Sequence, residues 1–373
     1  MINRIKPLDI QLAYWLSRQT SRTGVRRVAQ LDAALGSDIG MVRSENQDRA
    51  VVAQGWDSSG RRFALAVVAD GIGGMRAGAA CASLAVSSCV SAVYDSAQSG
   101  VVASEKWLTD AFASANNSVF EQYHGEGGST LVAALIRPGY PTCWASVGDS
   151  RVYISENKSV HQLSVDDTIA GQLDKSIGSP EQSKLLQYVG MGSDLEPHVH
   201  ALKEGQQGNL ILVSDGVHYL GKSSDWFERL ISFSPDAGSC AKRLIELANW
   251  CGGPDNATVV ILPTSSQQQP IPPAFDFLEI WDSYGEVQFF GQLSSKAEPE
   301  EKALTGRGEE LLKPGRITIS RIKKAVVSER SAGSSSTTKK DKIKVVENKK
   351  SRALKKAEVE EPQLTMEFPN RKR

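Results

Sequence analysis

Short apolar runs, each ended by a turn residue, are the feature that most limits how this chain can fold. Six such runs are rich in β-branched residues and are bounded by Gly, Asp, Asn or Pro, which is typical of buried strands. They are Phe63–Ala69, Ser129–Ile136, Cys143–Val147, Arg151–Ile154, Leu210–Val213 and Ala257–Leu262. All are far shorter than the roughly 18–20 apolar residues that a membrane helix needs, so we expect no membrane span.

Four helical patterns lie among these strands. Apolar residues recur at helical spacing in 77–94, 105–123, 224–231 and 241–250, and Gly252-Gly253 ends the last of them. Strand pairs come before and after helix pairs instead of alternating with single helices, which favours an α+β fold over a doubly wound parallel sheet. We therefore expect sheets sandwiched between helices.

Composition divides the chain into four parts: residues 1–33 with a short amphipathic helix, an ordered domain at 34–263, a linker and hairpin at 264–295, and a basic tail at 296–373. The hairpin is predicted from Phe275–Trp281 and Val287–Phe290, and it needs a partner surface because two strands alone are marginally stable. The tail is charged, poor in aromatic residues and of low complexity, which predicts disorder.

The formal neutrality of the chain, with 43 Lys+Arg and 43 Asp+Glu, hides two dissimilar parts. Residues 301–373 hold 20 basic and 10 acidic residues, which leaves 23 basic and 33 acidic residues in the first 300. We expect the tail to be a solvated extension; the alternatives are docking onto a partner protein through 275–290 and binding to an anionic surface or nucleic acid through its lysines.

Five cysteines occur without a C-x-x-C pair, and most stand in apolar stretches, where free cysteine is usually a buried small hydrophobe. Residues 1–18 lack the continuous apolar segment and cleavage site of a secretory signal. We therefore expect a reducing compartment, the cytoplasm.

Five aspartates stand at strand ends. Asp70, Asp149 and Asp215 follow apolar strands, and Asp48 and Asp255 precede them. One such aspartate is ordinary turn chemistry, but five converging carboxylates would repel one another unless a cation lay among them. Because all these donors are hard oxygens, the pattern favours Mg²⁺ or Mn²⁺ over zinc or copper.

Two further residues extend this site. In Asp70-Gly-Ile-Gly-Gly74 the missing Cβ of Gly71 lets its carbonyl approach a metal. Arg43, five residues before Asp48, is either an ordinary surface residue or a fork that holds phosphate oxygens. His198-x-His200 resembles a metal-binding pair but has no further spaced ligands, so we expect ordinary polar roles for it.

Seven short motifs resemble, in the same order, those of the metal-dependent protein phosphatases, the type 2C serine/threonine family. They are Arg43-x-x-Asn46-Gln-Asp48, Asp70-Gly-Ile-Gly-Gly74, Gly128-Ser-Thr130, Val147-Gly-Asp-Ser-Arg151, Leu163-Ser-Val-Asp166, Val213-Ser-Asp-Gly216 and Asp255-Asn-Ala-Thr258. The resemblance covers about residues 34–263 and implies a central β-sandwich of two antiparallel sheets flanked by helix pairs, with two Mn²⁺ or Mg²⁺ ions at one end and a weaker third.

The resemblance also implies the role of each site residue. Arg43 matches the phosphate-binding arginine. The metal ligands, in chain order, are Asp48 for one ion, Asp70 as the bridging ligand, the carbonyl of Gly71, Asp149 for the weaker third ion, and Asp215 and Asp255 for the other ion.

The function implied is hydrolysis of phosphoserine and phosphothreonine on proteins by a water that two metal ions activate, without a covalent phosphoenzyme. Phosphorylated proteins are the expected substrates, and a cognate Ser/Thr kinase is an expected partner by analogy. The alternative is a catalytically silent domain that binds phosphoproteins as a scaffold. The complete set of metal aspartates favours the enzyme.

Two positions depart from the family pattern. Ile72 stands where eukaryotic members often carry a histidine that is a candidate general acid. Asp167 replaces the histidine of the usual Asp-His-Ser/Thr motif. We expect these changes to affect leaving-group protonation and substrate handling rather than metal binding.

Overall fold

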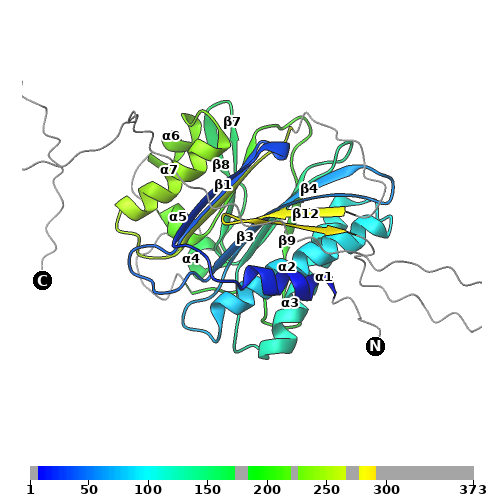
Figure 1. Cartoon of the computed structure of the whole chain (residues 1–373), viewed down its shortest axis with the longest axis horizontal. Coiled ribbons are helices and arrows are strands. Elements are labelled where there is room, and N and C mark those ends of the chain that lie inside the picture. Colours follow the sequence, from blue (N-terminus) through cyan, green and yellow to red (C-terminus); the bar gives the residue numbers. More distant parts are fainter. Residues whose placement is uncertain (1–6, 173–183, 220–225, 266–276, 291–373) are drawn as a thin grey trace, which may run out of the picture. The chain divides into compact units, whose positions relative to one another are not determined.

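Two antiparallel sheets face each other in the computed structural model, which describes residues 7–172, 184–219, 226–265 and 277–290 (Figure 1). Sheet A has the order β1 (Thr23–Val28), β2 (Ala33–Asp38), β11 (Ala257–Pro263), β10 (Asn209–Val213), β7 (Arg151–Glu156) and β8 (Ser159–Gln162). Sheet B has the order β13 (Glu286–Phe290), β12 (Phe277–Trp281), β3 (Asp48–Trp56), β4 (Arg62–Asp70), β5 (Leu131–Ile136), β6 (Cys143–Val147) and β9 (His198–Ala201).

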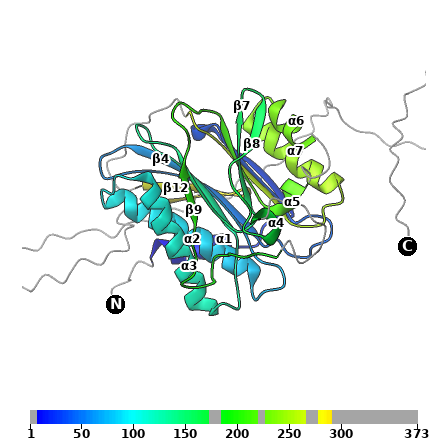
Figure 2. The ribbon, with the colours of Figure 1, turned by 180° about the vertical axis from the view of Figure 1, so that it is seen from behind.

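Helices cover the outer face of each sheet. Sheet B is covered by α1 (Leu8–Leu16), α2 (Gly78–Gln98) and α3 (Ser104–Tyr123), and sheet A by α5 (Asp215–His218), α6 (Trp226–Ser232) and α7 (Ala237–Trp250). Figures 1 and 2 show the two helix groups on opposite sides of the sandwich. The short helices η1 (Ala29–Leu31) and α4 (Ile169–Gln172) lie in connections. The predicted helix–sheet–sheet–helix architecture is confirmed.

The central strands of each sheet are buried on both faces, which explains why they are apolar without alternation. In β3, Val51 packs beneath the helices of sheet B, while its neighbour Val52 packs between the two sheets. In β10, Ile211 packs beneath the helices of sheet A and Leu212 packs between the sheets. The side chains still alternate with period two, but both faces meet an apolar core.

By length and composition alone, helix α2 is long and apolar enough to cross a membrane, although the sequence predicts no membrane span. Its most apolar 18-residue window is 72% buried inside the protein, where the helix contacts α1, α3 and sheet B. These contacts are those of a core helix.

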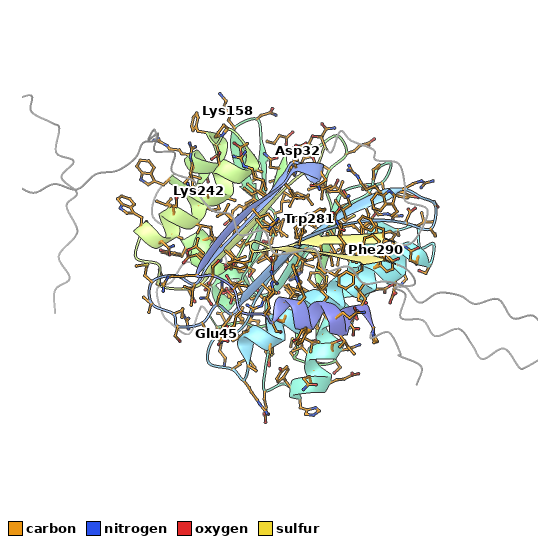
Figure 3. The ribbon with its side chains drawn as sticks, in the orientation of Figure 1. Asp32, Glu45, Lys158, Lys242, Trp281 and Phe290 are labelled. Atoms are coloured by element: carbon orange, nitrogen blue, oxygen red, sulfur yellow. The ribbon has the colours of Figure 1, made fainter. Side chains whose placement is uncertain are left out.

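The predicted hairpin is confirmed as β12–β13, and its partner surface is β3, to which β12 pairs from Leu278↔Gly55 to Trp281↔Val52. Figure 3 marks Trp281 near the hairpin turn and Phe290 at its open end. At the other terminus, β1 joins sheet A through β2. Strands from beyond both predicted boundaries, 34 and 263, thus belong to the two sheets. Residues 266–276 of the predicted linker and the predicted tail lie outside the described residues.

Candidate active site

A cavity of about 520 Å³ at one end of the sandwich gathers most of the predicted site. Its lining includes Arg43, Asp70, Gly71, Asp149, Asp215 and Asp255. The remaining residue, Asp48, is 3% exposed, and the β3–β4 register places it directly opposite Asp70. The structure thus brings together the aspartates that the sequence placed at separate strand ends.

The Gly128-Ser-Thr130 motif fixes the backbone of Asp70. Thr130 donates its backbone N–H to the Asp70 carbonyl at 2.8 Å, and its Oγ1 accepts the Asp70 N–H at 3.0 Å. Ser129 Oγ donates to the same carbonyl at 2.8 Å. These bonds hold the backbone of Asp70 in place, so its carboxylate is the group that faces the cavity and the other aspartates.

Sheet A contributes the bonds that orient Asp48. Ser214 Oγ, one residue before Asp215, donates to Asp48 Oδ2 at 2.8 Å and accepts the Thr258 N–H at 2.9 Å. The carboxylate of Asp48, at the start of β3 in sheet B, is therefore held by the hydroxyl of Ser214, which directly follows β10 of sheet A.

Two residues that sequence reasoning did not select hold the loops around the cavity. Asn256 accepts the Gln47 N–H at 2.8 Å and donates to the carbonyls of Ile39 and Glu45 at 2.9 Å, which ties the loop carrying Arg43 to the start of β11. His218 Nε2 donates to the Asp149 carbonyl at 2.9 Å. The position of His218, three residues after Asp215, was the only sequence signal for this contact.

The carboxylates are electrostatically strained. Burial raises the pKa of Asp48 to about 7, with added repulsion from Asp215 and Asp255. Burial, followed by repulsion from Asp215, also raises the pKa of Asp149 to about 7. Burial and four neighbouring aspartates raise the pKa of Asp70 well above its ordinary value. Such a cluster favours a bound cation because both burial and mutual repulsion oppose ionisation.

The donor set fits a hard divalent ion. Asp48 Oδ1 and Asp215 Oδ1 are buried oxygens with no hydrogen-bond partner among the described residues. A Cβ on Gly71 would come within 2.2 Å of the Gly78 carbonyl, so only glycine fits where the Gly71 backbone meets the site. Over the described ranges, no three His, Cys, Asp or Glu side chains form a group that could hold an ion by itself. An ion here therefore needs the Gly71 carbonyl and water as further ligands, as Mg²⁺ commonly does.

Arg43 lies among these acids, not on an isolated surface. Its Nη2 donates to Asp255 Oδ2 at 2.7 Å, and this bond raises the pKa of Arg43. A Cβ on Gly73 would lie 3.2 Å from Arg43 Nη1, so the guanidinium lies close over this glycine. With 44% of its side chain exposed, Arg43 is also accessible to an anion entering the cavity.

Asp167 has a supporting role. It is 1% exposed, and its Oδ2 accepts the Gly148 N–H at 2.9 Å, next to Asp149. Its Oδ1 lies 2.8 Å from His198 Nε2 and accepts from Gln187 Nε2 at 3.2 Å. His200 stacks against Trp144 at a centroid distance of 4.8 Å. Both histidines thus have protein partners, which agrees with the ordinary roles expected for them.

Ile72 lines the cavity together with Met75, Tyr188 and Lys184, and none of the described lining residues is a histidine. The Tyr188 ring packs where a Cβ on Gly128 would lie 2.5 Å away. This part of the cavity lining is therefore largely apolar, and Lys184 contributes its one ammonium group. No described side chain of this wall offers an imidazole to protonate a leaving group.

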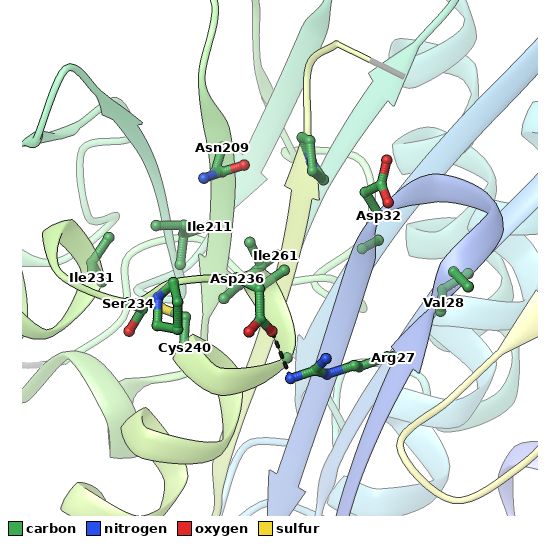
Figure 4. Close-up of a pocket in the computed structure, with 16 residues that line it drawn as sticks. Arg27, Val28, Asp32, Asn209, Ile211, Ile231, Ser234, Asp236, Cys240 and Ile261 are labelled. Atoms are coloured by element: carbon green, nitrogen blue, oxygen red, sulfur yellow. Dashed lines mark ion pairs between the residues drawn. The ribbon is translucent and has the colours of Figure 1, made fainter. Parts of the chain in front are cut away.

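A second cavity of about 440 Å³ lies between the outer face of sheet A and the start of α7 (Figure 4). An ion pair of 2.8 Å between Arg27 and Asp236 crosses its lining, and Cys240 is buried there. Burial raises the pKa of the Cys240 thiol to about 11, so it is not an activated nucleophile. This cavity contains none of the predicted site residues.

Residues 42–250, more than half of the chain, match the family described as Protein phosphatase 2C. The protein phosphatase PhpP of Streptococcus pneumoniae is 27% identical over 250 residues, which are 64% of this chain and 99% of that protein. The structure of the S. agalactiae serine/threonine phosphatase aligns with a TM-score of 0.55 at 25% identity, covering 62% of this chain and 99% of that one.

The catalytic domain of the serine threonine protein phosphatase PstP, solved in complex with two manganese ions, aligns with a TM-score of 0.51 at 27% identity. The alignment covers 65% of this chain and 98% of that domain. With the motifs in order, the same fold and the matching sequence family, this chain is an enzyme of the protein phosphatase 2C family.

Proposed function

We propose that this serine/threonine protein phosphatase hydrolyses phosphoserine and phosphothreonine with a water activated by two Mn²⁺ or Mg²⁺ ions bound at Asp48, Asp70, Gly71, Asp215 and Asp255. A weaker third ion is proposed at Asp149 with Asp215. Arg43 holds the phosphate oxygens that face away from the metals. Phosphorylated proteins are the proposed substrates.

The observation that carries this proposal is the convergence of buried and half-buried, mutually repelling carboxylates beside an accessible guanidinium. Asp48 and Asp215 each present an unpartnered buried oxygen to this cluster. Arg43 lies at the mouth and is already paired with one acid, Asp255. The site can therefore hold a phosphate between the cation-binding carboxylates and the Arg43 guanidinium. In-line attack by water requires this arrangement.

The direct test measures phosphate release from matched phosphoserine, phosphothreonine and phosphotyrosine peptides with Mn²⁺ and with excess EDTA. We expect turnover of the first two peptides with Mn²⁺ and none with EDTA. EDTA-resistant hydrolysis would overturn the proposed mechanism, and the absence of any Mn²⁺ binding heat would favour the silent scaffold.

Replacing Arg43 with alanine should lower kcat/KM for a phosphopeptide by about 10- to 100-fold, because a charge-assisted hydrogen bond to phosphate contributes about 1.5–3 kcal/mol. Calorimetry should still detect Mn²⁺ binding. Arg76→Ala is the matched control, since this arginine is 69% exposed and pairs with Glu126 away from the acids. Equal kinetics of the two variants would contradict the phosphate-binding role.

We propose that this protein acts in the cytoplasm. Its five cysteines are free and four of them are buried, as is usual in a reducing compartment.

A further inference from the structure

The β12–β13 hairpin lies beyond the segment matched by the family, yet it is built into the catalytic domain. Leu278, Ile280, Val287 and Phe289 are buried in the same core as helices α1 and α2. Burial of these four large apolar side chains holds the hairpin firmly against the domain. Its turn, residues 282–285, is therefore held at a defined position.

The hairpin turn is also locked to the N-terminal segment. Arg18 Nη2 donates to both oxygens of Asp282, at 2.8 and 2.6 Å, and its guanidinium lies 3.9 Å from the Trp15 ring centroid. The Asp282 Oδ1 also accepts the backbone N–H groups of Tyr284 and Gly285, at 2.8 and 2.6 Å. These bonds direct the Tyr284 side chain toward β1 and β2.

Tyr284 connects the turn to the residues behind Asp48. Its ring lies where a Cβ on Gly24 would come within 2.5 Å, so Gly24 makes room for it. Its hydroxyl donates to the Ser37 carbonyl at 3.3 Å and lies 3.5 Å from Asn46 Nδ2. Both distances are long for such bonds, so each contributes modestly.

Asn46 connects Tyr284 to the metal ligand Asp48. Its Oδ1 accepts the Asp48 N–H at 3.0 Å, and its Nδ2 donates to Ser37 Oγ at 2.9 Å. Ser37 Oγ in turn lies 2.9 Å from Thr258 Oγ1, and the Thr258 N–H donates to Ser214 Oγ, which donates to Asp48 Oδ2. The Tyr284 hydroxyl therefore reaches Asp48 by two routes, through Asn46 to its backbone and through the Ser37 residue to its side chain.

A half-buried arginine, Arg49, reinforces the same region. Arg49 Nε donates to the carbonyl of Leu16, the last residue of α1, at 2.9 Å. Its Nη1 donates to the carbonyls of Asn46 and Asp48 at 2.8 and 2.7 Å. Helix α1 and the hairpin thus both contact the segment that leads into β3, α1 at Arg49 and the hairpin at Asn46.

We infer that Tyr284 is a positioning residue for the metal ligand Asp48, so that the appended hairpin sets the affinity of the site for Mn²⁺. The inference rests on the proposed function. Outer groups that orient ligands typically change metal affinity by about 10- to 100-fold. The long contacts of the Tyr284 hydroxyl place its effect near the lower end.

The test compares Tyr284→Phe with Tyr14→Phe in the full chain. Both changes remove one phenolic hydroxyl, but the Tyr14 side chain is 84% exposed on α1. By calorimetry we expect Tyr284→Phe to weaken Mn²⁺ binding about 3- to 10-fold, and Tyr14→Phe to leave it unchanged. The kcat of Tyr284→Phe should fall at low Mn²⁺ and recover at saturating Mn²⁺, a rescue that a general loss of folding would not give.

A double-mutant cycle with Ser37→Ala tests the connection itself. Since Ser37 Oγ accepts from Asn46 and links Ser37 to Thr258 on the route to the Asp48 side chain, Tyr284→Phe should cost less Mn²⁺ affinity in the Ser37→Ala background than in the wild type. Equal Mn²⁺ affinities of wild type and Tyr284→Phe would overturn the inference while leaving the proposed function intact. A wild-type protein that binds no Mn²⁺ would overturn both.

Discussion

Asp70→Asn should abolish Mn²⁺ binding and lower phosphatase turnover by at least about 10²- to 10³-fold, while raising the thermal stability of the metal-free protein. Activity falls because the proposed bridging carboxylate is lost. Metal-free stability rises because Asp70 lies half-buried among four other aspartates, and desolvation and their charges raise its pKa well above the ordinary value. A neutral amide of the same shape removes that repulsion.

The measurement is calorimetric titration with Mn²⁺ together with thermal unfolding in EDTA near pH 8. The Tm should increase by a few degrees, since about 1 kcal/mol shifts the Tm of a domain of this size by roughly 2–4 °C. Asp110→Asn is the control, because this carboxylate is 43% exposed on α3 and pairs with Lys106. Retained Mn²⁺ binding and turnover in Asp70→Asn would show that Asp70 is not a metal ligand.

The metal-free protein should become less stable as the pH rises from 5.5 to 8, and bound Mn²⁺ should cancel or reverse this trend. Burial raises the pKa values of Asp48 and Asp149 to about 7, whereas an unfolded aspartate titrates near 3.9. Between these values the folded state binds more protons than the unfolded state. The contribution of these two carboxyls to the free energy of unfolding is therefore largest below about pH 4. It declines as the pH rises through 7.

Mn²⁺ requires the same carboxylates in their ionised form, so its apparent affinity should fall as the pH drops. With two carboxylates titrating near pH 7, we expect binding at pH 6 to be about tenfold or more weaker than at pH 8. Saturating Mn²⁺ at 100 times its Kd adds about 2.7 kcal/mol of stability, or roughly 5–10 °C in Tm. Thermal scans with EDTA or Mn²⁺ at pH 5.5, 6.5, 7.5 and 8 measure both trends. A Tm in EDTA that rises over this range would contradict the assigned pKa shifts.

Local sequence was sufficient for several of the strands whose side chains are buried on both faces, although the fully buried β2 was not predicted. The run Cys143–Val147 is predicted and observed with the same bounds because every one of its residues is buried. By contrast, β9 was not predicted, since His198–Ala201 is partly exposed and its two histidines have distant partners, Asp167 in the connection after β8 and Trp144 on β6. The strand β1 was missed for the same reason, because its burial is confined to one end.

Amino-acid sequence alone determined which oxygen donors exist and where they stand along the chain: a carboxylate in a strand-end turn is readable because aspartate is unfavourable inside a strand. Only the tertiary structure decided which distant residues hold those carboxylates. Asp167 and His198 are 31 positions apart, and Asn46 and Tyr284 are 238 apart. Contacts at such separations leave no local pattern, because they depend on how two sheets and an added hairpin pack together, and that packing makes an appended turn part of the surroundings of Asp48.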